Sequence, residues 1–398
     1  MAVISIQNLD VVFGDNTSQT LSLMDEGKSR NEILGITGDV VGVQNANIDV
    51  EEGEICVLMG LSGSGKSTLL RTINGLNKVA RGKCLVRDGD TMIDMATCNE
   101  SMLRHIRTNR VSMVFQSFAL MPWLTVRENV AFGLEMQGLG KIERMKKAKE
   151  QIDMVGLGQW ADKKIDELSG GMKQRVGLAR AFAMDSDVLL MDEPFSALDP
   201  LIRTQLQDEL IELQQKLNKT IIFVSHDLDE ALKIGSKIAI MESAKVIQQD
   251  KPEEIVLNPA TEYVEKFVAH TNPLNVLKGV SLMTSREKMA IFEGGYLDEG
   301  IHYYVDEKNA LIKLEKDGLP LNENHWEIGQ VIDGLTVGGV TRVPFNISMR
   351  DAAEIRYKTN QSLVLIKDEC FVGTLSDNNF YHALLGKHFN RSDVEADG

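Results

Sequence analysis

Hydrophobic and polar positions along the chain follow two alternating periods. Short, mostly apolar runs occur at Ile55–Met59, Val188–Met191, Thr220–Val224 and Lys237–Met241. Runs of this kind are typical of strands buried in a parallel sheet. Between them lie stretches with helical spacing, and the clearest is a stripe interpreted as core packing: Ile202, Leu206, Leu210, Leu213 and Leu217. Strands that alternate with helices at these lengths predict an α/β fold with a mostly parallel sheet flanked by helices.

The start of the chain has a different pattern. Residues 2–13 alternate, become apolar and end at Phe13-Gly14, which predicts an edge strand closing on a turn. Residues 15–40 are polar and interrupted by glycines, so we expect an insertion with two short helices. Alternation returns over Val41–Val50, where a second strand is expected.

A helical block interrupts the sheet pattern between residues 101 and 184. It contains one strand-like stretch, 110–116, followed by helical periods over 126–137 and 142–155. In the last of these, four apolar residues fall near a common face: Ile142, Met145, Ile152 and Val155. The block therefore predicts a helical subdomain inserted into the α/β domain.

The character of the sequence changes near residue 271. Beyond it, Gly, Asp and Asn punctuate short strand patterns such as Ile301–Val305 and Ala310–Leu314. We place a linker at Thr271-Asn272-Pro273. The sequence thus predicts a first domain over 1–270 and a small α+β domain over 271–398.

Composition narrows the class of protein and its partners. The 398 residues are enough for two or three domains, and the formal net charge of −15 argues against a nucleic-acid binder, which usually presents a basic face. The four cysteines are far apart, which indicates neither a zinc site nor disulfides and fits a reducing cytosol. The first residues lack a signal-peptide pattern, and no apolar run is long enough to cross a bilayer. We therefore expect any membrane contact to come through a partner.

The stretch with the most specific chemistry is Gly60-Leu61-Ser62-Gly63-Ser64-Gly65-Lys66-Ser67-Thr68, which fits G-x-x-x-x-G-K-[ST] at every fixed position. It follows a predicted buried strand and leads into a helical pattern. Glycines let successive N–H groups turn into one anion-sized hollow, and the following helix adds its positive end. Lys66 is placed to reach the β- and γ-phosphates of a nucleotide, and the Ser67 hydroxyl to ligate Mg²⁺. A chance match in a Gly/Ser surface loop is the competing interpretation.

Two carboxylates follow a later apolar strand. Asp192 at the tip of Val188–Met191 is placed to hold Mg²⁺, directly or through water. Glu193, one residue on, is placed to polarise an attacking water as general base. Two acids after a strand also occur as ordinary solvated turn residues. With the phosphate-loop motif upstream, the catalytic interpretation is favoured.

A second glycine corner, Ser169-Gly170-Gly171, precedes another helical stretch. The Ser169 hydroxyl could cap that helix, and the two glycines would let backbone N–H groups approach a phosphate closely. A plain glycine-rich helix start is the alternative. Two phosphate-contacting corners in one chain suggest that the first corner of one subunit and the second corner of another grip each nucleotide together.

Four further side chains are candidates for the site. His226 follows Thr220–Val224 and could reach the γ-phosphate from the carboxyl end of that strand. Gln116 ends the strand before it and could bridge Mg²⁺ or water. Asp199 could start the helix after Pro200, near a dimer interface. Phe13 offers a flat apolar face to an adenine ring, with core packing as an equal alternative.

Together these residues resemble the ATP-binding cassette (ABC) transporter ATPases over residues 1 to about 270. The resemblance assigns Gly60–Thr68 to the Walker A loop, Gln116 to the glutamine loop, Leu168–Met172 to the signature, Val188–Asp192 to Walker B, Glu193 to the catalytic glutamate, Ser196–Asp199 to the D-loop, and His226 to the switch histidine. Phe13 stands where the family often has a tyrosine that stacks on adenine. The resemblance implies a P-loop NTPase cassette with an antiparallel edge β-subdomain and an inserted helical subdomain, and ATP and Mg²⁺ as cofactors.

A closer resemblance, to the ATPases of quaternary-amine importers, covers nearly the whole chain. The insertion Leu21–Val41 and the stretch Phe115–Pro122 are similar to that group. The stretches most similar to its choline-type members are Trp123–Gly138, Phe267–Leu277 and Met349–Gly386. In the tail, Leu363–Leu385 resembles one half of a paired CBS regulatory module, so the second domain is expected to be partly CBS-like.

This resemblance implies an ATPase subunit that powers uptake of a quaternary amine, choline first and glycine betaine or proline betaine otherwise. It implies ATP sandwiched between two copies of the chain, with Glu193 as base and with Lys66, His226 and Gln116 in catalytic roles. It also implies an integral membrane permease, a periplasmic substrate-binding protein reached through that permease, and a place on the cytoplasmic face of the inner membrane. Two other classes stay open: a soluble non-transport cassette ATPase, and a phosphate-loop kinase, in which Leu168–Met172 has no role.

Overall fold

The computed structural model describes residues 2–196, 198–269 and 271–385. The chain divides between Pro252 and Glu253 into two compact units. Helix α11 (Glu262–Val268) belongs to the second unit, although the sequence placed everything up to residue 270 in the first domain. Within the described residues, no helix combines the length and the apolar content needed to cross a bilayer.

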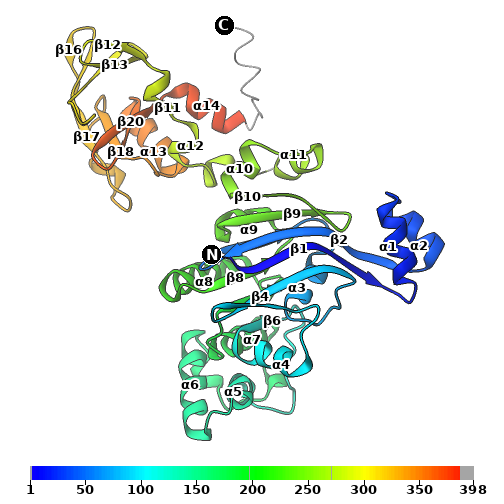
Figure 1. Ribbon diagram of the computed structural model, residues 1–398. Helices are drawn as coiled ribbons and strands as arrows, with labels where there is room; N and C mark the ends of the chain where they lie inside the picture. The colour runs from blue at the N-terminus through cyan, green and yellow to red at the C-terminus, as the bar shows by residue number, and fades with distance from the viewer. Residues whose placement is uncertain (1, 197, 270, 386–398) are drawn as a thin grey trace. The chain divides into compact units, whose positions relative to one another are not determined.

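The first unit contains a four-stranded antiparallel sheet in the order β2-β1-β4-β5 (Figure 1). Its strands are β1 Ala2–Phe13, β2 Val40–Glu51, β4 Arg81–Asp88 and β5 Thr91–Asp94. β1 pairs with both β2 and β4, so the prediction that it lies at an edge is wrong. Alternation of apolar and polar residues shows only that one face of a strand is buried. An interior strand of an antiparallel sheet has one buried face just as an edge strand does. The predicted insertion forms α1 (Thr17–Asp25) and α2 (Arg30–Thr37) between β1 and β2.

A six-stranded sheet in the order β10-β9-β3-β8-β7-β6 carries the predicted parallel strands, and only β10 among its members is antiparallel to its neighbour. Its strands are β3 Ile55–Met59, β6 Val111–Val114, β7 Val188–Asp192, β8 Thr220–Val224, β9 Lys237–Glu242 and β10 Lys245–Asp250. Every residue of β3, β7 and β8 is buried, which explains why these strands lack polar alternation. The predicted α/β class is therefore confirmed.

Helices connect and cover these strands. They are α3 Lys66–Ile73, α4 Glu100–Asn109, α5 Val126–Met136, α6 Lys141–Met154, α7 Gly170–Ala183, α8 Pro200–Leu217 and α9 Leu228–Ile234, with 3-10 turns at Gly158–Trp160 and Ile165–Glu167. α5, α6 and α7 share their own core, which includes Val130, Ile152 and Val176. Ile142 is 90% exposed, so its predicted place on the buried face of α6 is wrong. Ile142 lies ten residues before the buried Ile152. Because ten residues are not a whole number of helical turns, the two side chains do not lie on the same face.

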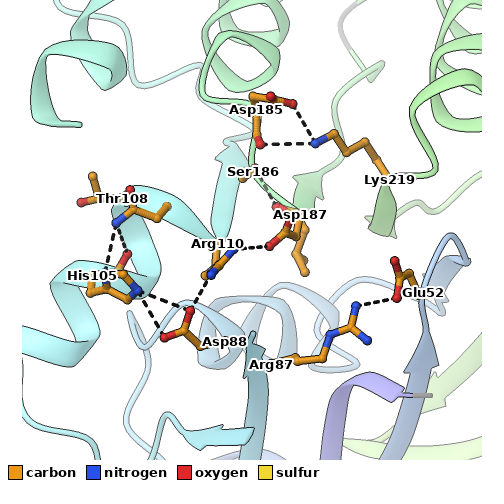
Figure 2. A network of polar contacts seen from close by, with 12 residues as sticks. Glu52, Arg87, Asp88, His105, Thr108, Arg110, Asp185, Ser186, Asp187 and Lys219 are labelled. Atoms are coloured by element: carbon orange, nitrogen blue, oxygen red, sulfur yellow. Dashed lines mark hydrogen bonds and ion pairs between the residues drawn. The ribbon is translucent and has the colours of Figure 1, made fainter. Parts of the chain in front are cut away.

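A polar network ties the two sheets together at the amino ends of the parallel strands (Figure 2). Arg110, just before β6, donates to Asp88 of β4 at 2.6 Å and to Asp187, just before β7, at 2.9 Å. Lys219, just before β8, pairs with Asp185 at 2.8 Å. The hydrogen bond from Arg110 holds the pKa of Asp88 below its usual value. The amino ends of the parallel strands are thus occupied by structural ion pairs.

The second unit contains two five-stranded sheets. One has the order β11-β20-β19-β18-β17, with strands β11 Thr284–Ser285, β17 Glu323–His325, β18 Val340–Pro344, β19 Leu363–Lys367 and β20 Cys370–Leu375. The other is an antiparallel meander of β12 Ala290–Phe292, β13 Gly295–Asp298, β14 Ile301–Val305, β15 Leu311–Lys316 and β16 Leu319–Pro320. The helices are α10 Pro252–Leu257, which begins at the division, then α11, α12 Gly279–Leu282, α13 Met349–Thr359 and α14 Asp377–Leu385, with 3-10 turns at Pro273–Asn275, Arg286–Lys288 and Ile332–Gly334.

The half-module predicted over Leu363–Leu385 corresponds to a hairpin of β19 and β20 followed by α14. β18 and α13 precede it, so this part of the unit runs strand, helix, two strands, helix. The meander lies in the sequence between β11 and β17, where no second half-module was recognised. What this unit does stays a prediction.

Candidate active site

The phosphate loop, Gly60–Thr68, runs from the end of β3 into α3. Gly60 and Gly65 have positive φ angles of 140° and 104°. A Cβ atom on Gly60 would lie 2.1 Å from the Met241 carbonyl oxygen, and one on Gly65 would lie 2.4 Å from the Gly42 carbonyl oxygen. Only glycine satisfies both the backbone conformation and this close approach. The two motif glycines are therefore required by the fold of the chain itself.

Lys66 begins α3 and is only 6% exposed. Its Nζ donates to the carbonyl oxygens of Gly60 at 2.7 Å and Leu61 at 3.0 Å, so the amine is folded back over the loop. Burial lowers the pKa of Lys66, while the charges of Glu193 and Asp192 oppose that shift. A desolvated ammonium in this position is a strong binder of anions, as a nucleotide phosphate requires.

Other loop residues leave polar groups for a ligand. Ser62 and Gly63 are exposed, and Ser64 is buried. The Ser64 hydroxyl has no hydrogen-bond partner among the described residues. A buried hydroxyl without a partner is costly unless a ligand or water satisfies it. The loop therefore fits a phosphate group.

Asp192 ends β7 and is fully buried. The Ser67 hydroxyl donates to its Oδ1 at 2.7 Å, and the Arg71 guanidinium donates to its Oδ2 at 2.8 Å. The predicted pair of Mg²⁺ ligands, Ser67 and Asp192, is thus in direct contact. Sequence reasoning missed Arg71. Its spacing of four residues from Ser67 on one helix could have revealed it, since residues i and i+4 share a helix face.

Glu193 contacts two of the other three predicted catalytic side chains, Gln116 and His226. The Gln116 amide donates to its Oε2 at 3.1 Å, and Nδ1 of His226 lies 3.5 Å from the same oxygen. Glu193 adopts a positive φ of 48°, and its N–H donates to the Val224 carbonyl at 3.1 Å. The three residues follow β7, β6 and β8, which are neighbours in the sheet. Their carboxyl ends bring together groups that are far apart in the sequence.

Gln116 lies beyond the end of β6 at Val114, so the prediction that it ends the strand is wrong by two residues. The loop that follows is fixed by Arg180 of α7, which donates to the carbonyl oxygens of Phe118 at 2.8 Å and Ala119 at 2.6 Å. Both loop residues have positive φ angles. Arg180 was missed because nothing in the local sequence connects it to residue 116.

The signature corner, Ser169–Gly171, begins α7. The Ser169 hydroxyl accepts from the Met172 N–H at 3.4 Å, which is the predicted helix cap. Ser169 and Gly170 are exposed, so the corner is open to a neighbouring molecule. A Cβ on Gly171 would lie 3.1 Å from the Leu198 side chain, whereas one on Gly170 would meet nothing within 4 Å.

Asp199 and Phe13 also lie at positions that suit their predicted roles. Asp199 caps α8 by accepting from the Ile202 N–H at 3.1 Å, and its neighbour Ala197 is outside the described residues. Phe13 is 44% exposed. A Cβ on Gly42 would lie 2.6 Å from the Phe13 ring and 2.9 Å from the Thr68 methyl group, so ring and loop end are close together. This exposed ring beside the loop favours contact with a base over core packing.

The hard oxygen atoms of Ser67 and Asp192, which are in direct contact, fit the ligand preference of Mg²⁺. The third predicted ligand, Gln116, contacts Glu193, the residue next to Asp192, through its amide nitrogen. Within the residues that are described, no group of three or more His, Cys, Asp or Glu side chains is arranged to hold a metal by itself. A phosphate loop, two oxygen ligands and a carboxylate held by an amide and an imidazole make up a site for nucleotide hydrolysis.

Comparison with known proteins places this geometry in a family. The family model for "ABC transporter" matches residues 43–196. The chain is 39% identical over 413 residues to the glycine betaine transport ATP-binding protein OpuAA of Bacillus subtilis, across 99% of this chain and 97% of that protein. It is 51% identical over 264 residues to the glycine betaine/proline betaine transport system ATP-binding protein ProV of Escherichia coli, across 66% of this chain and 65% of ProV.

Another relative is the trimethylamine N-oxide transport system ATP-binding protein TmoW of Pelagibacter ubique, 43% identical over 83% of this chain and 94% of that protein. Among solved structures, a dimeric ATP-binding cassette in a post-hydrolysis state with ADP and Pi matches with a TM-score of 0.54 and 29% identity, over 63% of this chain and 98% of that one. The match to OpuAA spans nearly all of both chains, and the motifs fall in the expected order along the chain. The chain is therefore an ATPase that belongs to the family of ABC transporter ATP-binding proteins.

Proposed function

We propose that this chain hydrolyses ATP to power import of a quaternary amine, with choline as the substrate first implied by the sequence. The observation that carries the ATPase part is the position of Glu193, held by Gln116 and His226 beside the phosphate loop. The relatives named above support the substrate class, since glycine betaine and proline betaine are quaternary amines and trimethylamine N-oxide also has a methylated nitrogen with four substituents and a formal positive charge. Choline shares that chemistry.

The chain works as a pair of subunits in this proposal. ATP lies between the phosphate loop of one copy and the signature corner of the other, with Phe13 against the base. The exposed Ser169 and Gly170 support this arrangement, and so does the dimeric form of the matching solved cassette. Asp199 lies next to the interface through the segment that packs on Gly171.

Glu193 accepts a proton from the attacking water. Gln116 and His226 contact the same carboxylate oxygen, so they orient the base toward its water. Lys66 stabilises the negative charge that develops on the transferred phosphoryl group. Ser67, Asp192 and Gln116 would hold Mg²⁺, and the ion would supply positive charge to offset that of the nucleotide phosphates.

Partners follow from the transport role. We place the chain on the cytoplasmic face of the inner membrane, bound to an integral permease and linked through it to a periplasmic substrate-binding protein. The surface near Gln116–Arg127 is the proposed permease contact, because it joins the catalytic glutamine to the helical subdomain. Trp123 is 69% exposed there, an unusual position for a large apolar side chain unless a partner covers it. No nucleic-acid partner is proposed.

The Glu193→Gln substitution tests the catalytic assignment. It keeps size and hydrogen bonding but removes the base, so steady-state ATPase activity should fall by about 100- to 1,000-fold while ATP binding is retained. Unchanged activity would contradict the assignment. The transport role is tested by co-purification with the permease and by competition of choline, glycine betaine and proline betaine for ATP-dependent uptake into vesicles. Purification without any membrane complex would instead support a non-transport ATPase.

A further inference from the structure

The helix pair inserted between β1 and β2 contacts the phosphate loop. Arg30, the first residue of α2, donates from Nη1 to the Gly63 carbonyl oxygen at 3.1 Å. Gly63 has a positive φ of 79° and is one of three glycines of the loop in this conformation, together with Gly60 and Gly65. We propose that Arg30 is a positioning residue for the phosphate loop, and that residues 15–39 act as a strap that sets the affinity of the site for ATP. The proposal rests on the ATPase function above.

The strap reaches both ends of the nucleotide site. It leaves β1 after Phe13 and returns at Val40, and these two residues are paired in the sheet. Phe13 packs beside Thr68, at the end of the phosphate loop where the base is proposed to lie. Arg30, which follows the turn between α1 and α2, contacts Gly63 in the middle of that loop. In Figure 1 the two helices, in dark blue, lie beyond the ends of β1 and β2.

The strap is anchored, so it can hold Arg30 in place. Met24 and Ile33 are buried against Val41 of β2 and Ala244, the latter in the turn after β9. Ala244 N–H also donates to the Ser64 carbonyl of the phosphate loop at 3.1 Å, so strap and loop pack on the same turn. Asp39, at the end of the strap, is buried and accepts from the Thr20 hydroxyl at 2.9 Å.

The start of α2 is fixed as well. Ser29 and Glu32 form a reciprocal capping box, in which the Ser29 N–H donates to Glu32 at 2.8 Å and the Glu32 N–H donates to the Ser29 hydroxyl at 3.3 Å. Arg30 lies inside this turn. Its backbone is therefore set before its side chain contacts the loop, which lowers the entropy lost in forming that hydrogen bond.

Charge around Arg30 favours an anion nearby. Arg30, Lys28 and Lys245 line an open groove of about 690 Å³, and Glu242 also lines it. None of the three cations forms an ion pair with a carboxylate of the described residues, although the chain as a whole carries a net charge of −15. The positive charge of Arg30 is thus not balanced by an ion pair with a carboxylate of the described residues.

Two effects on ATP binding follow. A carbonyl held by a charged donor keeps the loop in its bent conformation, so less ordering remains to be done when phosphate binds. The positive charge of Arg30 also adds to that of Lys66. Glu193, Gln116 and His226 are held by contacts that do not involve Arg30, so the chemical step should be affected much less than binding.

The test compares Arg30→Ala, Arg30→Lys and the matched control Lys28→Ala in the full-length chain. Lys28 lines the same groove and carries the same charge but makes no hydrogen bond to the loop in the described structure. Measurements are the Kd for a fluorescent ATP analogue with Mg²⁺, KM and kcat for ATP, and Tm without nucleotide. For Arg30→Ala we expect Kd and KM to rise about five- to tenfold, with kcat within about twofold of wild type.

Arg30→Lys should recover part of the affinity, because an ammonium can also donate to the carbonyl, and it remains informative if the alanine variant misfolds. Lys28→Ala should stay within about twofold of wild type. The proposal is overturned if Arg30→Ala binds ATP like wild type, if Lys28→Ala weakens binding equally, or if only kcat falls. A wild-type chain that neither binds nor hydrolyses ATP would instead contradict the proposed function.

Discussion

The two glycine corners of this protein are constrained by different things. In the phosphate loop, Gly60 and Gly65 have positive φ angles, and a Cβ on either would collide with backbone oxygens of the same chain. In the signature corner, Gly170 has helical geometry, and a Cβ there would meet nothing within 4 Å. The first pair of glycines is required by folding. Nothing in the chain's own packing requires the second corner's Gly170, so we expect any requirement for glycine there to come from a molecule that approaches the corner.

Gly65→Ala should have the largest effect, because it tests the corner that folding requires. A side chain there combines a disfavoured φ with a 2.4 Å contact to the Gly42 carbonyl, at a cost of at least about 3 kcal/mol. Thermal denaturation should show Tm lower by roughly 6–12 °C for a unit of this size, and ATP binding should be lost. A variant with wild-type Tm and ATP affinity would show that the two corners do not differ in this way.

Gly170→Ala should leave folding intact and remove activity. Alanine stabilises helical positions relative to glycine by up to about 1 kcal/mol, so Tm should stay the same or rise slightly. ATPase activity of the paired subunits should fall by about 100-fold if backbone N–H groups at this corner stabilise the transferred phosphoryl group. ATP binding by the single chain should survive, since the phosphate loop is untouched. A fall in Tm together with activity would refute the comparison.

Mixing variants provides the control for that result. A copy carrying Gly170→Ala retains a sound phosphate loop, and a copy carrying Lys66→Ala retains a sound signature corner. If the two corners meet across subunits, a mixed pair contains one intact site and one doubly damaged site. Activity should then reappear on mixing. If both corners served the same nucleotide within one chain, mixing two inactive variants would recover nothing.

The smallest effect is expected at the opposite edge of the parallel sheet, where the network of Figure 2 serves stability rather than chemistry. Arg110 holds the pKa of Asp88 below its usual value, so the ionised carboxylate stabilises the fold above pH ~4 and loses that contribution as pH falls through the lowered pKa. Asp88→Asn should lower the free energy of unfolding by about 1 kcal/mol at pH 7, with ATPase activity per folded molecule unchanged.

Denaturation of wild type and Asp88→Asn at pH 7 and pH 3 checks this sign. The difference in stability between the two proteins should shrink at pH 3, because the wild-type carboxyl is then increasingly protonated. A difference that grows in acid would mean that another group dominates. Loss of ATPase activity in Asp88→Asn at pH 7 would mean that the network at the amino ends of the strands also affects the catalytic residues at their carboxyl ends.

Local pattern predicted the parallel strands well, because β3, β7 and β8 are mostly apolar and are buried over their whole length. Thr220–Val224 was predicted with the bounds that β8 has in the structure. The edge position assigned to β1 was wrong, because alternation does not distinguish one neighbouring strand from two. Ile142 was placed on the wrong face of α6, where helical spacing over ten residues gives only an approximate angle.

The catalytic motifs were recognisable because each is short and continuous in the sequence. The arginines that support them were not. Arg30, Arg71 and Arg180 contact Gly63, Asp192 and the carbonyls of Phe118 and Ala119 from elements elsewhere in the chain. Arginine in a sequence indicates a charged surface position by default. Only its partners show that it orders a loop.

By itself the sequence determined the α/β class and the phosphate-loop motif, and it predicted which residues hold phosphate, metal and water. These depend on residue type and on spacing within a few positions. The tertiary structure decided that Glu193 meets both Gln116 and His226, that the inserted helix pair contacts the phosphate loop, and that the signature corner faces outward. Those facts depend on which strands are neighbours and which carbonyls are turned toward a donor, and residues far apart in a chain do not encode that in any local pattern.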